Sequence, residues 1–253
     1  MTPEPFRRSA LRLRLGGLAL CWRRRLLWHT GGLRFARPRP EVECPYLRAE
    51  HATPLLRRLR GEDMALQRSK VTNLRLAAAR LDGPTRRRGY VEGMILRNGR
   101  VASGVGGGLC QMTNLLYWMT LHTPLTVTER WRHGYDVFPD SNRTQPFGSG
   151  ATCFYNYMDL MVRNDTPDTW RLVLQVTDTH LEREWRADGP QTCRYEVYEK
   201  EHEIRGEYWG GFTRHNTLFR RVLGMDGAEL GEEFITENHA IMMYNPMLEE
   251  TAP

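Results

Sequence analysis

The 253-residue chain lacks the patterns that mark disulfide frameworks and metal centres. Its five cysteines are an odd number and include no Cys-x-x-Cys pair, so they form neither a disulfide framework nor a zinc pattern. This cysteine usage is typical of a reducing compartment. The eight histidines are scattered and lack the spacing of metal ligands. We therefore expect no metal and no other cofactor.

A long hydrophobic run is also missing. The apolar stretch over residues 15–22 is short, and Arg23, Arg24 and Arg25 follow it at once. A membrane-spanning helix needs about 20 apolar residues. A signal peptide places its charges before the apolar region and a small-residue cleavage site after it. Neither pattern is recognised, so we expect a protein that is cytoplasmic or peripheral at the inner membrane surface.

Acidic residues are scarce near the N-terminus. Residues 1–60 contain 14 Arg and 4 Glu, a formal charge of +10, whereas the whole chain carries +6, so residues 61–253 carry −4. The basic, amphipathic stretch from Leu11 to Leu33 is suited to an anionic membrane surface. The alternative is a helix packed on its own domain with a solvated Arg face. Nucleic acid is not favoured as a partner, because no recognition motif accompanies the charge.

Hydrophobic periodicity predicts an α+β fold. Apolar residues at helical spacing predict a helix over 62–81, and a second, buried helix begins at Cys110. The Asn98-Gly99 dipeptide indicates a hairpin over 89–103. Strand composition follows over 125–129, 151–157, 160–163, 170–176, 181–185, 195–198 and 218–223. We expect two core helices packed on a mainly antiparallel β-sheet, with a β-rich C-terminal half.

The most informative stretch is the glycine-rich turn before the second helix, Gly104-Val-Gly-Gly-Gly-Leu-Cys110. Glycines let the backbone adopt positive φ and approach another group closely. Cys110 then falls in the first helical turn, where unpaired N–H groups and the helix dipole stabilise a thiolate. Its pKa is therefore expected below the usual value of about 8.5. The alternative is an inert, buried cysteine.

A nucleophilic cysteine needs a base or a cation beside it. His133 ends the segment Glu129-Arg-Trp-Arg-His133, and a strand returning from the second helix can place it at the helix N-terminus. There it would take the thiol proton, while Glu129 or Asp136 orients the imidazole. The alternative is a surface or capping histidine. Tyr155 and Asn156 are further candidates because they follow a loop rich in Pro, Gly, Asn and Ser.

Several ordered blocks of this sequence resemble the VanW family of accessory proteins, which is named from vancomycin-resistance clusters. These blocks are residues 73–78, 106–118, 121–127, 129–133, 146–152 and 159–166. The resemblance covers about residues 61–177, which we take as a core domain. A basic N-terminal segment, 1–60, precedes it, and a β-rich extension, 178–253, follows it.

The resemblance implies a cell-envelope protein linked to glycopeptide resistance. Related domains are similar to cysteine-dependent L,D-transpeptidases that act on peptidoglycan stem peptides. Carried onto this chain, Cys110 is the acyl-accepting nucleophile and His133 its base, and backbone N–H groups around Gly108 form an oxyanion hole. The expected substrate and oxyanion residues are Gly106, Gly107, Gly108, Gln111 and Asn114.

Two departures from the family pattern leave the enzyme assignment open. The segment Pro-Gly-Glu-x-Phe-Ser-Phe, which many members carry before the glycine turn, is absent, and Gly150 stands where many members have Asp. Both favour a second hypothesis, a non-catalytic module that binds a cell-wall precursor or partner protein. In that hypothesis the glycine loop supplies backbone donors. A third hypothesis is a membrane-surface or nucleic-acid adaptor that uses the basic N-terminus.

Overall fold

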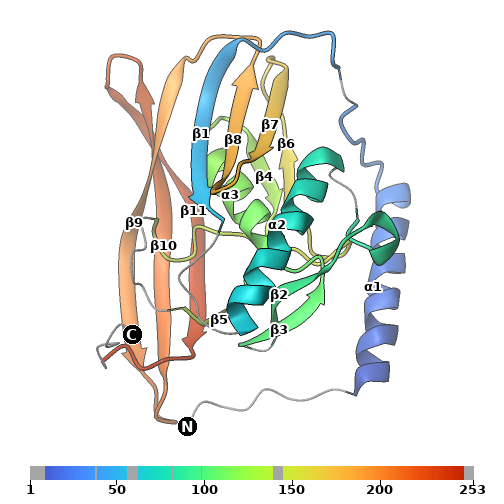
Figure 1. Cartoon of the computed structure of the whole chain (residues 1–253). Helices are drawn as coiled ribbons and strands as arrows, with labels where there is room; N and C mark the ends of the chain where they lie inside the picture. The colour runs from blue at the N-terminus through green and yellow to red at the C-terminus, as the bar shows by residue number, and fades with distance from the viewer. Residues whose placement is uncertain are drawn as a thin grey trace.

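The computed structural model describes residues 9–37, 39–55, 62–80, 83–97, 99–138 and 145–247. Leu81, Asn98 and the first part of the loop expected over 140–150 therefore lie outside the described residues. Within them the α+β prediction is confirmed, because helices pack against largely antiparallel sheets (Figure 1). A sheet of long strands stands on one side of the molecule and an N-terminal helix on the other (Figure 1).

Both predicted core helices are present. They are α2 (Glu62–Arg80) and α3 (Cys110–Leu121), with a short 3-10 helix, η1 (Arg86–Arg88), after α2. The basic N-terminal stretch forms a third helix, α1 (Ala10–Thr30), in which Ser9 accepts a hydrogen bond from the backbone of Arg12 as an N-cap. No helix in the described part of the chain is long and apolar enough to cross a bilayer.

A three-stranded antiparallel sheet supports the core helices. It has the order β1-β8-β7, formed by β1 (Tyr46–Pro54), β8 (His180–Ala187) and β7 (Trp170–Val176). Two of these strands, β7 and β8, match the segments 170–176 and 181–185 expected from the sequence. The strand β1 was not predicted, because the prolines at its borders, Pro45 and Pro54, suggested a broken stretch.

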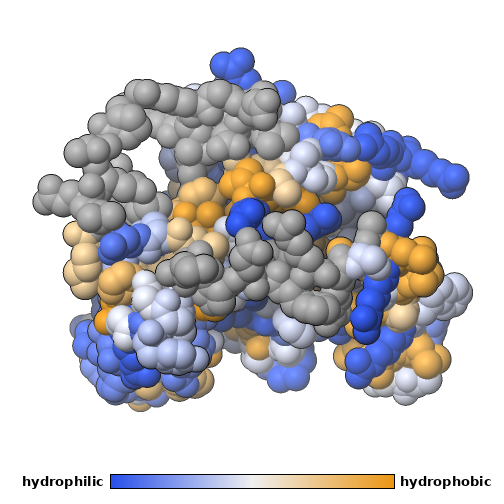
Figure 2. Space-filling view, turned by 90° about the horizontal axis from the view of Figure 1, so that it is seen from below, coloured by the Kyte–Doolittle hydropathy of each residue, from blue (hydrophilic) through white to orange (hydrophobic). Residues whose placement is uncertain are grey.

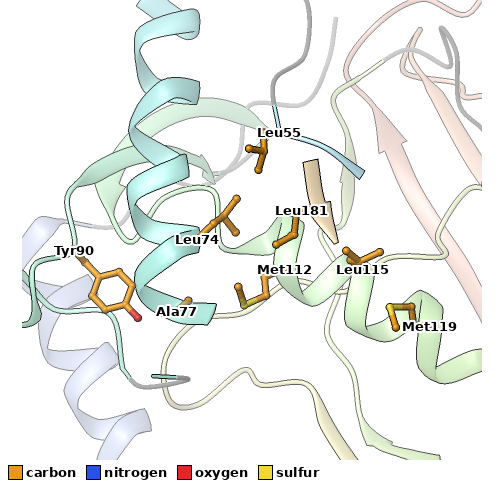
Figure 3. Packing of buried hydrophobic residues seen from close by; sticks show 8 residues of the cluster. All are labelled: Leu55, Leu74, Ala77, Tyr90, Met112, Leu115, Met119 and Leu181. Carbon is orange, nitrogen blue, oxygen red and sulfur yellow. The ribbon is translucent and has the colours of Figure 1, made fainter. Parts of the chain in front are cut away.

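The main core lies between this sheet and the two helices α2 and α3. Figure 3 shows its buried side chains, which come from the residue after β1, from α2, from the segment before β2, from α3 and from β8: Leu55, Leu74, Ala77, Tyr90, Met112, Leu115, Met119 and Leu181. Alternate residues of β7 and β8 face the helices, as the period of two in a strand requires. The core therefore fixes α3, and with it the position of Cys110.

Two short strand pairs flank the core. The predicted hairpin is confirmed as β2 (Glu92–Arg97) and β3 (Arg100–Val105), with Gly99 at a φ of 71°. The other pair is β4 (Thr126–Glu129) with β6 (Met161–Arg163). The strand expected over 151–157 is wrong. That segment makes isolated bridges through Thr152 and Phe154 and then reverses direction.

A second sheet contains the longest strands of the protein. Its order is β5-β11-β10-β9, formed by β5 (Tyr135–Asp136), β11 (Glu229–Met242), β10 (Phe212–Gly224) and β9 (Cys193–Gly206). β5 runs parallel to β11, and the other neighbours are antiparallel. The sequence predicted only a short part near the start of β9, 195–198, and near the end of β10, 218–223, and missed β11.

Candidate cysteine site

The glycine turn brings β3 into α3 by packing backbone on backbone. A Cβ atom on Gly107 would lie 2.1 Å from the carbonyl of Gly93 in β2, so only glycine fits there. Gly108 has a φ of 91° and packs against the side chain of Lys70 in α2. These close contacts explain the glycines as a means of placing Cys110 at the first position of α3.

A buried asparagine of α2 holds this turn. The amide nitrogen of Asn73 donates to the carbonyls of Gly107, at 2.9 Å, and Val91, at 3.0 Å. Its carbonyl oxygen accepts from the N–H of Val91 at 2.9 Å. Asn73 is completely buried, so these bonds have no competition from water. The sequence analysis did not single out Asn73 as a site residue, because its partners lie far away along the chain.

The backbone donors of the glycine turn are mostly used inside the protein. Gly106 N–H donates to Val91, Gly107 N–H to Gly104 and Gly108 N–H to Met94, all through backbone carbonyls. The N–H groups of Leu109 and Gln111 donate to carbonyls of the turn itself. Among the described residues, no backbone carbonyl accepts from Cys110 N–H. The oxyanion hole expected around Gly108 to Gln111 is therefore reduced to this one donor.

Three side chains surround the sulfur of Cys110. Its Sγ lies 3.0 Å from the hydroxyl oxygen of Thr152, and the thiol of Cys153 and the imidazole of His133 lie near enough to lower its pKa. The structure thus brings together Cys110 and His133, which are separated in the sequence. The sequence analysis missed Thr152 and Cys153 as partners of this sulfur.

These contacts change the acidity of both thiols. The hydrogen bond from Cys153 is the largest influence, and it lowers the pKa of Cys110 well below its usual value. Burial opposes this effect, while His133, Thr152 and the backbone N–H of Cys153 reinforce it. The pKa of Cys153 is raised, first by the same hydrogen bond and then by burial. The interaction between the two thiols therefore favours ionisation of Cys110 over ionisation of Cys153.

The segment that carries Thr152 and Cys153 is fixed by α3 itself. The side-chain oxygen of Asn114 accepts from Ala151 N–H at 2.8 Å, and the Thr113 hydroxyl donates to the Ala151 carbonyl at 2.7 Å. On the other side, Thr152 N–H donates to the Trp131 carbonyl at 2.8 Å. Asn114, a predicted substrate residue, therefore positions the donors to the sulfur.

Arg130 holds the residues just before Thr152 through hydrogen bonds to their backbone carbonyls. Its guanidinium donates to the Gly150 carbonyl at 2.8 Å and also to the Gly148 carbonyl. The guanidinium lies 4.9 Å from the centre of the Tyr117 ring of α3 in a cation–π contact. Burial lowers the pKa of Arg130, and the interaction with Tyr117 opposes that change. Both termini of the 148–153 segment are thus tied to α3.

The structure places Glu129 in a different role from the one expected. Its carboxylate accepts hydrogen bonds from the Arg24 guanidinium of α1, from Trp131 Nε1 at 2.6 Å and from Asp159 N–H at 3.1 Å. Burial acts to raise the pKa of Glu129, but these bonds hold it below the usual value. These contacts tie Glu129 to α1 rather than to His133.

The remaining candidates are distributed around the site. Asp136 is buried and accepts from the Tyr244 hydroxyl at 2.9 Å in the second sheet. Gln111 donates to the Thr53 hydroxyl at 3.0 Å and to the Pro54 carbonyl at 2.7 Å, which joins α3 to β1. Tyr155 is half exposed, whereas Asn156 is buried and its side-chain oxygen has no hydrogen-bond partner.

The arrangement gathers polar side chains around the thiol of Cys110. A sulfur at a helix N-terminus, polarised by thiol, hydroxyl and imidazole donors, has the parts that thiolate chemistry requires. In the described part of the chain, no group of three or more His, Cys, Asp and Glu side chains is arranged to hold a metal. The site is therefore described by its thiols, its imidazole and the Cys110 N–H.

The comparisons assign this fold and site to a family. The VanW-like protein family model matches residues 77–186. A protein of Enterococcus faecalis (strain ATCC 700802 / V583), described as vancomycin B-type resistance protein VanW, is 33% identical over 195 residues, which are 69% of this chain and 71% of that protein. No solved structure matches the chain. The chain belongs to the VanW family, as the sequence blocks predicted.

Proposed function

We propose that the chain is a cysteine-dependent acyltransferase of the cell envelope, with chemistry similar to that of L,D-transpeptidases. The observation that carries this proposal is the Cys110 thiol at the N-terminus of α3, whose pKa is lowered by the neighbouring side chains of Cys153, His133 and Thr152. Membership of the VanW family and the similarity to a vancomycin B-type resistance protein support a role in glycopeptide resistance. The proposed substrate is a peptidoglycan stem peptide.

The first half-reaction transfers an acyl group to sulfur. The Cys110 thiolate attacks the carbonyl carbon of a stem-peptide bond, and a C–S bond forms as the carbonyl becomes an oxyanion. The Cys110 N–H is the backbone donor available to that oxygen. The imidazolium of His133 gives its proton to the leaving amine as the C–N bond breaks. A thioester on Cys110 and a neutral His133 remain.

The second half-reaction returns the site to its starting state. An acceptor amine attacks the thioester carbon and forms the new C–N bond, and His133 takes a proton from that amine. The C–S bond then breaks, and Cys110 leaves as a thiolate. The donors from Cys153 and Thr152 stabilise this leaving group as well as the initial nucleophile.

Exposed aromatic side chains beside the sulfur support a peptide-binding role. Trp131 pairs with Thr152 in an isolated bridge, and Phe154 follows Cys153 directly. Their exposed fractions are 42% and 37%, large for side chains of this type next to a half-buried thiol. Aromatic rings at a site rim provide apolar contact area for a ligand.

The test is capture of the acyl-enzyme. The full chain is incubated with a synthetic stem tetrapeptide, and intact-protein and peptide mass spectrometry follow the adduct. We expect a thioester on Cys110 in the wild type and none in Cys110→Ser. Cys193→Ser is the matched control and should keep the adduct, because Cys193 lies in β9. Tetrapeptide binding that Cys110→Ser leaves unchanged, without any adduct in the wild type, would instead establish the binding-module hypothesis.

The hydrogen bonds of the glycine turn argue against the binding-module hypothesis. A binding module that uses backbone donors of the loop needs those N–H groups to face a ligand. Gly106, Gly107 and Gly108 instead donate to carbonyls inside the protein. The geometry therefore favours the thiol of Cys110 over the loop backbone as the working group.

We further propose that α1 associates with an anionic membrane surface. The helix sequence has no acidic residue, five arginines, and leucines and a tryptophan with exposed fractions between 42% and 68%: Leu11, Leu13, Leu15, Leu18, Leu20, Trp22, Leu26 and Leu27. Figure 2 shows orange side chains beside blue ones on the side of the molecule where Figure 1 places α1. Apolar side chains interleaved with arginines are suited to the boundary between lipid headgroups and acyl chains.

Flotation with vesicles tests the membrane proposal. The full chain should bind vesicles that contain anionic lipid more strongly than neutral vesicles, and rising salt should weaken this binding. A variant without residues 1–40 should lose it. Binding that is the same for both vesicle types and at all salt concentrations would contradict the electrostatic part of the proposal.

A further inference from the structure

A pair of histidines faces each other across the second sheet, away from the cysteine site. The antiparallel register places His215 of β10 directly opposite His239 of β11. Their Nδ1 atoms are 2.5 Å apart, and the ring centroids are 4.8 Å apart at an interplanar angle of 65°. Both residues lie outside the stretch that the family model matches. The pair is therefore a separate feature that the cysteine chemistry does not use.

The hydrogen-bond partners of the two Nε2 atoms indicate which nitrogen of each ring carries hydrogen. His239 Nε2 lies 3.0 Å from a carboxylate oxygen of Glu237, and a carboxylate only accepts, so this nitrogen carries hydrogen. His215 Nε2 lies 2.8 Å from the Thr213 hydroxyl oxygen, and that hydroxyl donates its own hydrogen to Glu207. The Thr213 oxygen therefore accepts from His215 Nε2–H.

These assignments leave the two Nδ1 atoms, which face each other, without hydrogen. In a neutral imidazole, one nitrogen carries hydrogen and the other carries a lone pair. With hydrogen on both Nε2 atoms, the lone pairs of the two Nδ1 atoms point at each other at hydrogen-bond distance. Two lone pairs at this separation repel each other unless a cation lies between them. The cation is either a shared proton or a metal ion.

The surroundings disfavour the proton near neutral pH. Burial is the first cause that lowers the pKa of His215, followed by Arg205 of β9 and by the facing ring of His239. Glu203 of β9 and Glu207 of the β9–β10 turn oppose this change, but the pKa stays below its usual value. Glu237 pairs with His239 on β11. The lone pairs of the two Nδ1 atoms are the donors that the geometry offers to a metal ion.

The geometry points to a surface site for a divalent transition-metal ion of the zinc, nickel and copper class, bound by the Nδ1 atoms of His215 and His239. Neutral imidazole is the commonest protein ligand for these ions. Metal-bound histidines usually give their other N–H to a carboxylate or another acceptor, as both rings do here.

The pair needs only a small rearrangement to hold the ion. Ligand nitrogens about 2.0–2.1 Å from zinc in a tetrahedral site lie about 3.3 Å from each other, so the rings must separate by less than about 1 Å. His239 is 56% exposed and free to make this adjustment. No third acidic or thiol ligand stands at ligand distance within the described residues, so water fills the remaining positions. The bound ion would cross-link β10 to β11.

Calorimetric titration of the chelator-stripped full chain with zinc chloride at pH 7.5 tests this site. We expect one zinc ion per chain at the histidine pair, a rise in Tm with zinc, and loss of both in His215→Gln and in His239→Gln. His180→Gln, a change at another histidine of a strand, is the matched control and should bind as the wild type does. Circular dichroism of each variant without zinc verifies that the sheet is formed.

Two further variants separate this site from the thiols and from adventitious binding. The double variant Cys110→Ser/Cys153→Ser should keep the zinc event, and Glu237→Ala should weaken it about tenfold to a hundredfold, because it removes the acceptor of His239 Nε2–H. Titration at pH 5 should weaken binding, because protons compete with the metal ion for the imidazole nitrogens. Zinc binding that survives both histidine variants, or that only the cysteine variant removes, overturns the proposal, as does absence of binding in the wild type.

Discussion

Replacing Cys153 by alanine should raise the pKa of Cys110 and leave the fold intact. The Cys153 thiol is the largest single influence that keeps the Cys110 thiolate stable, while burial works against that thiolate. Removing the donor leaves burial opposed only by His133, Thr152 and the Cys153 backbone N–H. Cys153→Ser provides a matched comparison, because a hydroxyl of similar size still donates to the sulfur.

The size of the effect follows from the strength of one such bond. A hydrogen bond to a charged group contributes about 1.5–3 kcal/mol. One pKa unit corresponds to about 1.4 kcal/mol. Cys153→Ala should therefore raise the Cys110 pKa by about one to two units. The serine variant should recover most of that shift, and Thr152→Val should give a smaller increase, since Thr152 contributes less than Cys153.

The assay is the rate of iodoacetamide labelling of the Cys110 peptide as a function of pH. Peptide mapping by mass spectrometry separates Cys110 from the other thiols. The wild-type rate should rise with pH through an inflection below about 8.5, because only the thiolate reacts. The alanine variant should show this inflection at higher pH. An unchanged inflection in Cys153→Ala, with a wild-type circular dichroism spectrum, would refute the role assigned to the second thiol.

Three stability predictions follow from buried contacts, each measured by urea unfolding. Asn73→Ala should lower the free energy of unfolding by about 2–3 kcal/mol, because it leaves buried backbone groups of the glycine turn without partners. Gly107→Ala should cost at least about 3 kcal/mol, since its Cβ meets the Gly93 carbonyl at 2.1 Å; Gly16→Ala, in open space, is its control. Arg183→Met should be neutral or raise stability by about 1–2 kcal/mol, because this buried guanidinium bonds only one carbonyl through Nη1 and leaves Nε and Nη2 unpaired. A loss of several kcal/mol in Arg183→Met would contradict that reasoning.

The sequence predicted the elements whose signals are local. The helix α2 has apolar residues at helical spacing, and the hairpin β2–β3 has a two-residue turn. The second sheet was harder to predict. Its strands carry exposed charged residues along much of their length, so β9 and β10 appeared short and β11 did not appear. Pairing in a four-stranded sheet stabilises strands whose own composition predicts little.

In the candidate site, too, residues marked by a local sequence pattern were predicted, and residues placed by long-range contacts were missed. Cys110 was identified because a glycine turn followed by an apolar helix is visible in consecutive residues. Cys153 was missed because its position depends on the hydrogen bonds that the backbone of Ala151 makes with Asn114 and Thr113, about one turn into α3. His215 and His239 were overlooked as a pair because their meeting depends on the register of β10 against β11. Register between strands cannot be read from histidine spacing.

Glu129 connects the two parts of the proposed function. Its carboxylate binds Arg24 of α1 and Trp131, and the Trp131 carbonyl receives the N–H of Thr152, which contacts the Cys110 sulfur. The helix proposed to lie on the membrane is therefore linked through two residues to a donor of the thiolate. Glu129→Gln removes the charge that Arg24 pairs with and should release α1 from this segment. Hydrogen exchange should then increase in residues 10–30, and iodoacetamide labelling of Cys110 should shift with it; faster exchange in α1 with an unchanged labelling profile would show that the helix and the cysteine site are independent.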